Sequence, residues 1–232
     1  VCLVAMMLLT SVVKAQNVSE ARRILNLYDA LALGGDAADG KVYRWKRPVR
    51  VRVVGSPSGL YRRWASHVVS GLADATGHSL QISEVLSAEI LLLFVPSMST
   101  VLDGQHNALL DRYFQDHDAR DRLFGRFRRD RAVCGGKLNA IGNELVEAVV
   151  LIPQDRLPPV VHACLSAQLA RAMGLPHKSD ADANSVMAER SPHSHLTGDD
   201  KMVLSLLYHP RMMVGLSRQE ALTIAESIMP DL

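Results

Sequence analysis

The sequence lacks several patterns on which common activities depend. It contains no glycine-rich phosphate-binding loop, no G-x-S-x-G nucleophile turn, no C-x-x-C pair and no internal repeat. It also lacks an excess of charge of either sign, because 26 Lys and Arg residues stand against 24 Asp and Glu residues and the formal net charge is +2. So small a charge does not by itself indicate binding to nucleic acid or to a membrane surface. We therefore expect no nucleic-acid partner.

A hydrophobic run of membrane-spanning length is not evident either. Residues 1–13 read VCLVAMMLLTSVV, and the polar sequence KAQN follows. This run is too short to cross the ~30 Å hydrocarbon core of a bilayer comfortably. Val13 and Ala15 put small residues at the minus-three and minus-one positions of a cleavage site, so we expect residues 1–15 to be a signal peptide and Gln16 to begin the mature chain. The alternatives are a retained membrane anchor and a buried helix.

Cysteine is scarce, with 3 residues in the chain. Removal of the expected signal peptide leaves Cys134 and Cys164 in a periplasmic or secreted protein, where we expect them to form a disulfide. Closing a loop of about 30 residues would stabilise the fold by roughly 3.5 to 4 kcal/mol in the chain-entropy model. The alternative is a nucleophilic Cys164 assisted by His162, but residues two apart on a helix point to different faces.

The composition is that of a globular protein. The 232 residues are 48% hydrophobic and 22% charged, which is enough to bury a full core. Residues 16–40 predict an N-terminal amphipathic helix and a linker, because Asn17 and Glu20 form an N-cap pattern ahead of an apolar stripe that Gly34 ends. Residues 41–232 then form the main domain.

Hydrophobic periodicity predicts an α+β fold for this domain. The expected strands are residues 49–54, 80–85, 88–95, 132–138 and 144–153. AEILLLFV, at 88–95, is apolar enough to lie centrally in a sheet, whereas the glycines of 132–138 favour an edge. The expected helices are residues 60–75, 160–173, a helix capped by Thr197 that runs to Tyr208, and a final helix that begins at the capping box of Ser217 and Glu220.

A polar, Arg-rich helical segment, residues 99–131, interrupts this order and includes RDRLFGRFRRDR. Arg and aromatic residues are the types that dominate protein interfaces, so the segment predicts a protein-binding surface. The candidate partner-binding residues are Phe124, Phe127, Arg126, Arg128 and Arg129. The alternative is a solvated helix face with both phenylalanines turned to the core, which the interleaved Asp121 and Asp130 favour.

Residues 167–177 read AQLARAMGLPH, and SVM follows at 185–187. This layout resembles the metzincin zinc proteases, whose motif is H-E-x-x-H-x-x-G-x-x-H followed by a methionine turn. With the motif glycine on Gly174, the first and second ligands of the motif fall on Ala167 and Arg171, its general base on Gln168 and its third ligand on His177. The degenerate zinc-site positions are Ala167, Gln168, Arg171 and His177, with Met187 as the methionine of the turn. The resemblance covers about residues 46–210 and implies a mixed sheet beside an active-site-type helix.

Only His177 retains a zinc-binding side chain. Ala167 has no donor atom, Gln168 cannot act as a general base, and Arg171 would place a permanent positive charge beside the metal. We therefore expect a pseudoenzyme without a metal or other cofactor. The alternative is a metal-dependent hydrolase with a relocated site built from His177 and residues 193–195. Asp180 and Asp182 are candidate calcium ligands, although aspartates in loops are more often turn residues.

A second resemblance concerns CLSAQLARAMGL, at 164–175, and LLYHPRM, at 206–212. These segments are similar to an uncharacterised family of secreted bacterial proteins with a domain of unknown function, whose helix reads C-L-x-E-E-L-x-Q-x-L-G-L. That resemblance implies a shared fold and the Cys134–Cys164 bridge, and it implies no activity. Active metzincins hold a peptide by strand addition beside their cleft. We therefore expect a non-catalytic binding or assembly subunit of an envelope or secreted complex, with a protein partner.

Overall fold

The computed structural model describes residues 19–35, 39–85, 87–114, 117–129, 133–180 and 183–231. The expected signal peptide, Asn17 and Asp182 lie outside these residues. Within the described ranges, no helix is both long and apolar enough to cross a bilayer.

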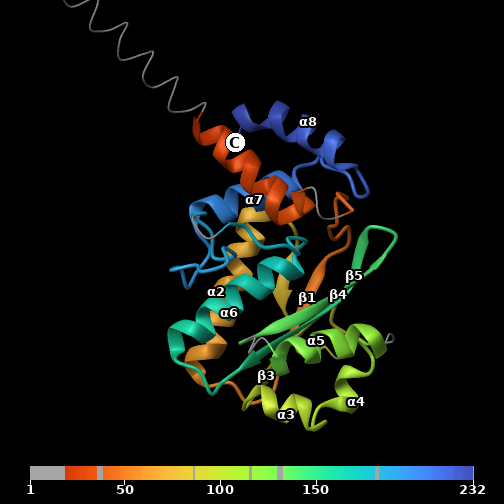
Figure 1. The fold of residues 1–232 in the computed structure, drawn as a ribbon, viewed down its shortest axis with the longest axis vertical. Coiled ribbons are helices and arrows are strands. Elements are labelled where there is room, and N and C mark those ends of the chain that lie inside the picture. Colours follow the sequence, from red (N-terminus) through yellow and green to blue (C-terminus); the bar gives the residue numbers. More distant parts are fainter. Residues whose placement is uncertain are drawn as a thin grey trace, which may run out of the picture.

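The fold is α+β, as predicted, and is built on a mixed sheet of five strands (Figure 1). The strands are β1 (Val49–Val54), β2 (Leu80–Ile82), β3 (Ile90–Val95), β4 (Gly135–Ile141) and β5 (Glu144–Pro153). Their order is β2-β1-β3-β5-β4, with β4 antiparallel to β5 and the other pairs parallel. The central position of β3 and the edge position of β4 are both confirmed. The second strand is shorter than its prediction, 80–85, because it ends at Ile82.

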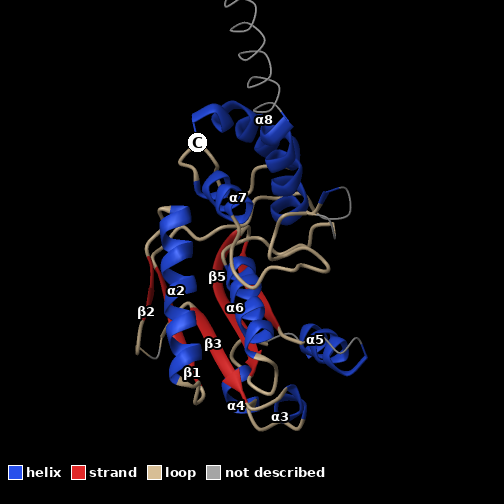
Figure 2. Ribbon diagram, turned by 90° about the vertical axis from the view of Figure 1, so that its left-hand side faces the viewer, coloured by secondary structure: helices blue, strands red, loops and turns tan. Residues whose placement is uncertain are grey.

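Helices cover both faces of the sheet. They are α2 (Gly59–Thr76), α3 (Met98–Leu102), α4 (Asn107–Leu110), α5 (His117–Arg129), α6 (Pro158–Ala172), α7 (Gly198–Tyr208), α8 (Arg218–Ile228) and the 3-10 helix η3 (Met229–Asp231). Figure 2 shows α2 and α6 side by side over one face, and the two helices pack together. The predicted helical segment 99–131 is mostly helical in its described residues, which include α3, α4 and α5.

The central strand divides the core into two parts. Ile90, Leu92 and Phe94 pack into the larger core with α2, α6 and α7. Leu91 and Leu93 pack into a smaller core with α3, α4 and α5. Because successive side chains of a strand point to opposite faces, a strand covered on both sides is apolar throughout. This explains the unbroken hydrophobic sequence of β3.

The N-terminal helix shares the larger core. Residues 19–28 are α-helical, and the helix continues as a π-helical turn, η1 (Asp29–Leu33), up to Gly34 with a φ of 73°. Its apolar stripe is buried, including Ile24 and Leu31. Arg218 at the start of α8 forms an ion pair of 2.7 Å with Asp29, so the two ends of the described chain are joined. Figure 1 shows this helix, in red, beside α7 and α8.

The predicted disulfide is confirmed. Cys134 and Cys164 are bonded, with their Cα atoms 5.9 Å apart. Cys134 immediately precedes β4 and Cys164 lies in α6, so the bridge fastens the edge of the sheet to the helix that carries the degenerate zinc-site positions. The alternative of a nucleophilic Cys164 is wrong, because its sulfur is held in this bond.

Candidate functional site

The sequence around Gly174 sets the direction in which the chain leaves α6. The helix begins with two prolines at its first positions, where no intrahelical N–H is needed, and ends at Ala172. Gly174 then adopts a φ of 106°, and a Cβ atom there would collide with the backbone carbonyl oxygen of Tyr43. Only glycine fits this turn without strain. The chain therefore turns sharply directly after α6.

Two buried aromatic side chains fix the end of α6. The indole Nε1–H of Trp45 donates to the carbonyl oxygen of Ala172 at 2.7 Å. The hydroxyl of Tyr208 donates to the carbonyl oxygen of Met173 at 2.8 Å. Carbonyl groups in the last turn of a helix lack intrahelical donors, so these bonds satisfy groups that would otherwise be buried without partners. The helix end is thereby held in one position relative to the sheet.

The SVM turn is held by the carboxylate of Asp200. Asp200 is fully buried and accepts hydrogen bonds from the Ser185 hydroxyl at 2.5 Å and the Val186 N–H at 3.0 Å. It also accepts from the N–H and the hydroxyl of Thr197, both at 2.9 Å, which completes the capping box of α7. Met187, the next residue of the turn, is buried in the larger core. Sequence reasoning found the cap but missed this second role of Asp200.

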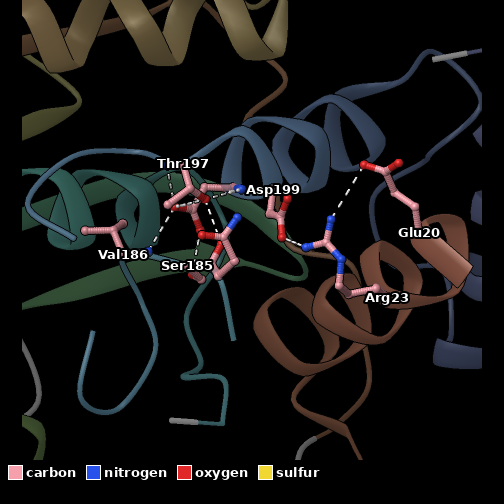
Figure 3. A network of polar contacts seen from close by, with 8 residues as sticks. Glu20, Arg23, Ser185, Val186, Thr197 and Asp199 are labelled. Atoms are coloured by element: carbon pink, nitrogen blue, oxygen red, sulfur yellow. Dashed lines mark hydrogen bonds and ion pairs between the residues drawn. The ribbon is translucent and has the colours of Figure 1, made fainter. Parts of the chain in front are cut away.

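A second polar link joins the N-terminal helix to the same region. Arg23 forms an ion pair with Asp199, the neighbour of Asp200, and another of 3.6 Å with Glu20. Figure 3 shows Arg23 reaching from its helix toward the start of α7. The N-terminal helix is therefore tied to the element that supports the SVM turn.

A cavity of about 620 Å³ lies where α5, α6 and the edge strand β4 meet. Its lining residues are Ala119, Arg122, Leu123, Arg126, Gly136, Lys137, Leu138, Val149, Val150, Gln168, Arg171, Ala172 and Pro176. Four of them carry positive charge, and none of the described lining residues is acidic. The cavity therefore combines an apolar wall with a cationic one.

The degenerate zinc-site positions divide between this cavity and the core. Gln168 and Arg171 line the cavity, as does Pro176, the residue before His177. Ala167 packs partly against the core and Met187 is buried within it. The structure thus brings Gln168 and Arg171 together in one cavity.

His177 is half-buried beside the end of the N-terminal helix. Its backbone N–H donates to the carbonyl oxygen of Leu31 at 3.2 Å. Burial lowers the pKa of its imidazole, the nearby Asp39 acts in the opposite direction, and the positive charge of Arg171 lowers the pKa further. The histidine and the arginine are therefore close enough for their charges to interact.

The Arg171 guanidinium is in an unfavourable environment. Burial lowers its pKa, and the positive charge of Arg126 across the cavity adds to the effect. Its Nε atom is buried and forms no hydrogen bond with the described residues. A buried donor without a partner costs roughly 1–3 kcal/mol, and more when it is charged. Such a group can be satisfied by a water molecule, an ion or a ligand that enters the cavity.

The structure corrects one part of the predicted partner surface. Phe124 and Phe127 are only 5% and 7% exposed, because both rings pack into the smaller core beneath α5. They therefore cannot contact a partner in this structure. The alternative interpretation, in which both phenylalanines face the core, is confirmed. Arg126 and Arg128 are exposed, and Arg126 lines the cavity. The side chain of Arg129 lies outside the described residues.

Among the described residues, the other candidate metal ligands do not form a cluster. His195 is close enough to His162 to influence its pKa, which burial lowers first, and His162 stacks on Trp64 with ring centroids 4.5 Å apart. Asp180 is exposed. In the part of the chain that the structure describes, no group of three or more His, Cys, Asp or Glu side chains is placed to hold a metal ion.

Comparison of the sequence with known protein families identifies one that matches most of the chain. Residues 22–227 match the sequence model of the family described as Protein of unknown function (DUF2927). The chain belongs to this family. The DUF2927 match extends from the N-terminal helix through the cavity to α8, so the whole site lies within it. No curated protein matches the chain.

Proposed function

We propose that this DUF2927 protein is an exported, non-catalytic binding protein whose site is the cavity between α5, α6 and β4, in a fold derived from the zincin type. One observation carries the proposal. At the positions of a metzincin's general base and second ligand, the cavity presents the Gln168 amide and the partly buried Arg171 guanidinium. Such a wall attracts anions and repels a metal cation.

The chemistry of these side chains argues against zinc. Zinc requires three or four neutral or anionic donors, whereas arginine has no acceptor atom and keeps its proton. A dication a few Å from a guanidinium would be repelled by several kcal/mol even at an effective dielectric constant of ~20. Arg126 on the opposite wall adds to this repulsion.

The edge strand supports a protein partner. One side of β4 pairs with β5, and no described strand pairs with its other side. Exposed edges accept extended segments by main-chain hydrogen bonding. Gly136, Lys137 and Leu138 of β4 also line the cavity, so a segment added at this edge would pass its side chains beside the cationic wall. The Cys134–Cys164 disulfide supports a periplasmic or secreted location.

Filling the cavity tests the proposal. Ala119 lies on α5 at the cavity wall, so Ala119→Trp should occupy the space without breaking the helix. We expect it to abolish co-purification of a protein partner from the native envelope, whereas Ser227→Trp, on the exposed side of α8, should leave it unchanged. Unchanged capture by Ala119→Trp would contradict the proposal, as would one tightly bound zinc per chain in the wild type by elemental analysis.

A further inference from the structure

The cavity contains positive charges that are not equally available to a ligand. The Lys137 amine donates to the carbonyl oxygen of Tyr113 at 3.2 Å and lies 5.3 Å from the centre of the Phe114 ring, so it is already engaged. Arg122 also has an interaction of its own. Arg171 differs from both, because its Nε is buried and has no hydrogen-bond partner among the described residues. Arg126 is exposed at the same cavity and repels Arg171 electrostatically.

Two guanidinium groups favour an anion between them when they share a cavity whose described lining residues include no acidic side chain. An anion would give the Arg171 Nε the acceptor that it lacks and would offset the repulsion between the two charges. Guanidinium groups bind carboxylates through two parallel N–H donors, a geometry that an ammonium cannot reproduce. The Gln168 amide, on the same wall, adds a further donor.

The remaining wall defines what must accompany the anion. Leu123, Leu138 and the β5 residues Val149 and Val150 line the cavity together with Ala172, and none of these side chains has a polar atom. A hydrated phosphate would leave this surface unused. A carboxylate attached to an apolar peptide segment would cover it and would place its charge at the arginines.

We propose that the cavity is a carboxylate-binding site in which Arg171 and Arg126 hold a carboxylate of an apolar peptide segment. This inference rests on the proposed function and specifies the ligand class of the same site. The carboxylate can belong to the C-terminus of the segment or to an acidic side chain within it. The chemistry at the arginines is the same in both cases.

Short peptides test the inference directly. The probes are acetyl-Leu-Val-Leu with a free C-terminus, the same peptide as its amide, and acetyl-Leu-Glu-Leu-amide. Binding to the mature, disulfide-bonded protein is measured by calorimetry and by the NMR signals of the arginine Nε–H groups. We expect at least one carboxylate probe to bind and to shift the Arg171 signal, while the neutral amide binds at least about tenfold more weakly. Which of the two carboxylate probes binds identifies the source of the group.

Variants separate bidentate recognition from general charge. Arg171→Lys keeps the charge and should weaken binding of the carboxylate probe about tenfold. Arg126→Gln should weaken its binding by a similar factor. Arg128→Gln is the matched control, since Arg128 is exposed on the same helix but does not line the cavity, and it should bind as the wild type. If Arg171→Lys does not fold, Arg126→Gln and Arg128→Gln still decide the question.

Several results would overturn the inference. These are equal binding of the amide and the carboxylate probes, equal effects of Arg126→Gln and Arg128→Gln, the absence of any Arg171 shift at millimolar probe, or a shift with inorganic phosphate but with neither carboxylate. If neither carboxylate peptide binds but Ala119→Trp still loses the partner, carboxylate recognition is refuted and the proposed binding function stands. Retention of the partner in Ala119→Trp would refute the binding function itself.

Discussion

At the scale of single residues, Asp200 connects two parts of the chain through one side chain. Its carboxylate closes the capping box at the start of α7 and accepts the hydrogen bonds that shape the turn at Ser185 and Val186. All these donors point at a fully buried acceptor. A carboxylate suits this position because it accepts at both oxygens and donates at neither.

We predict that Asp200→Asn lowers the free energy of unfolding by about 2–4 kcal/mol, because an amide group would turn N–H donors toward N–H and hydroxyl donors. Urea denaturation measures the change. The matched control is Glu220→Gln in the capping box of α8, where the polar contacts are exposed. This variant should lower the free energy of unfolding clearly less than Asp200→Asn does. Equal losses in the two variants would mean that the turn at Ser185 does not depend on Asp200.

At the scale of elements, the end of α6 determines where Gln168 and Arg171 face. The helix is fastened by the disulfide near its middle and by the hydrogen bonds of Trp45 and Tyr208 at its end. Gly174 allows the chain to turn away directly afterwards. These constraints keep Gln168 and Arg171 at the cavity that α6 shares with α5 and β4.

Gly174→Ala should destabilise the fold by about 2 kcal/mol or more, because alanine is strained at positive φ and its Cβ would meet the Tyr43 backbone. Gly71→Ala is the matched control within α2, where a Cβ has open space and helix propensity should stabilise by about 0.5–1 kcal/mol. Thermal and urea unfolding measure both. Opposite signs are expected, and a neutral Gly174→Ala would contradict the geometry of the turn.

At the scale of the whole molecule, half-buried histidines make stability depend on pH. Burial is the largest cause that lowers the pKa of His78, His162 and His177, which lie in different parts of the fold. Each imidazole therefore binds a proton more readily in the unfolded chain, where its pKa is ~6.5. The stability that these groups confer is complete above about pH 6.5 and is lost as the pH falls below it.

We predict that the free energy of unfolding of the wild type decreases from pH 7 to pH 5 more steeply than that of a variant with all three histidines replaced by glutamine. Urea denaturation at intervals across this range measures the two slopes. A constant difference between wild type and variant at every pH would show that these imidazoles do not couple folding to protonation.

The sequence by itself determined the features that depend on neighbouring residues. The alternation in 49–54 and the apolar run in 90–95 identified a strand and the centre of the sheet. The capping boxes before α7 and α8 identified where those helices begin. Such signals are local, because a cap, a turn or a periodic apolar face is encoded within one or two turns of chain. The Cys134–Cys164 disulfide could be predicted for another reason, because removal of the expected signal peptide left only these two cysteines to pair.

Only the tertiary structure decided which of these features meet. Phe124 and Phe127 have the sequence character of an interface, yet the smaller core on the second face of the sheet buries them. Asp200 looks like a helix cap, and its hold on Ser185 depends on a contact between residues 15 positions apart. Arg126 and Arg171 belong to helices separated by two strands, and the fold places both at one cavity. An apolar face or a charged side chain is compatible with many packing partners, so its partner is selected by the free energy of the whole fold and not by its local pattern.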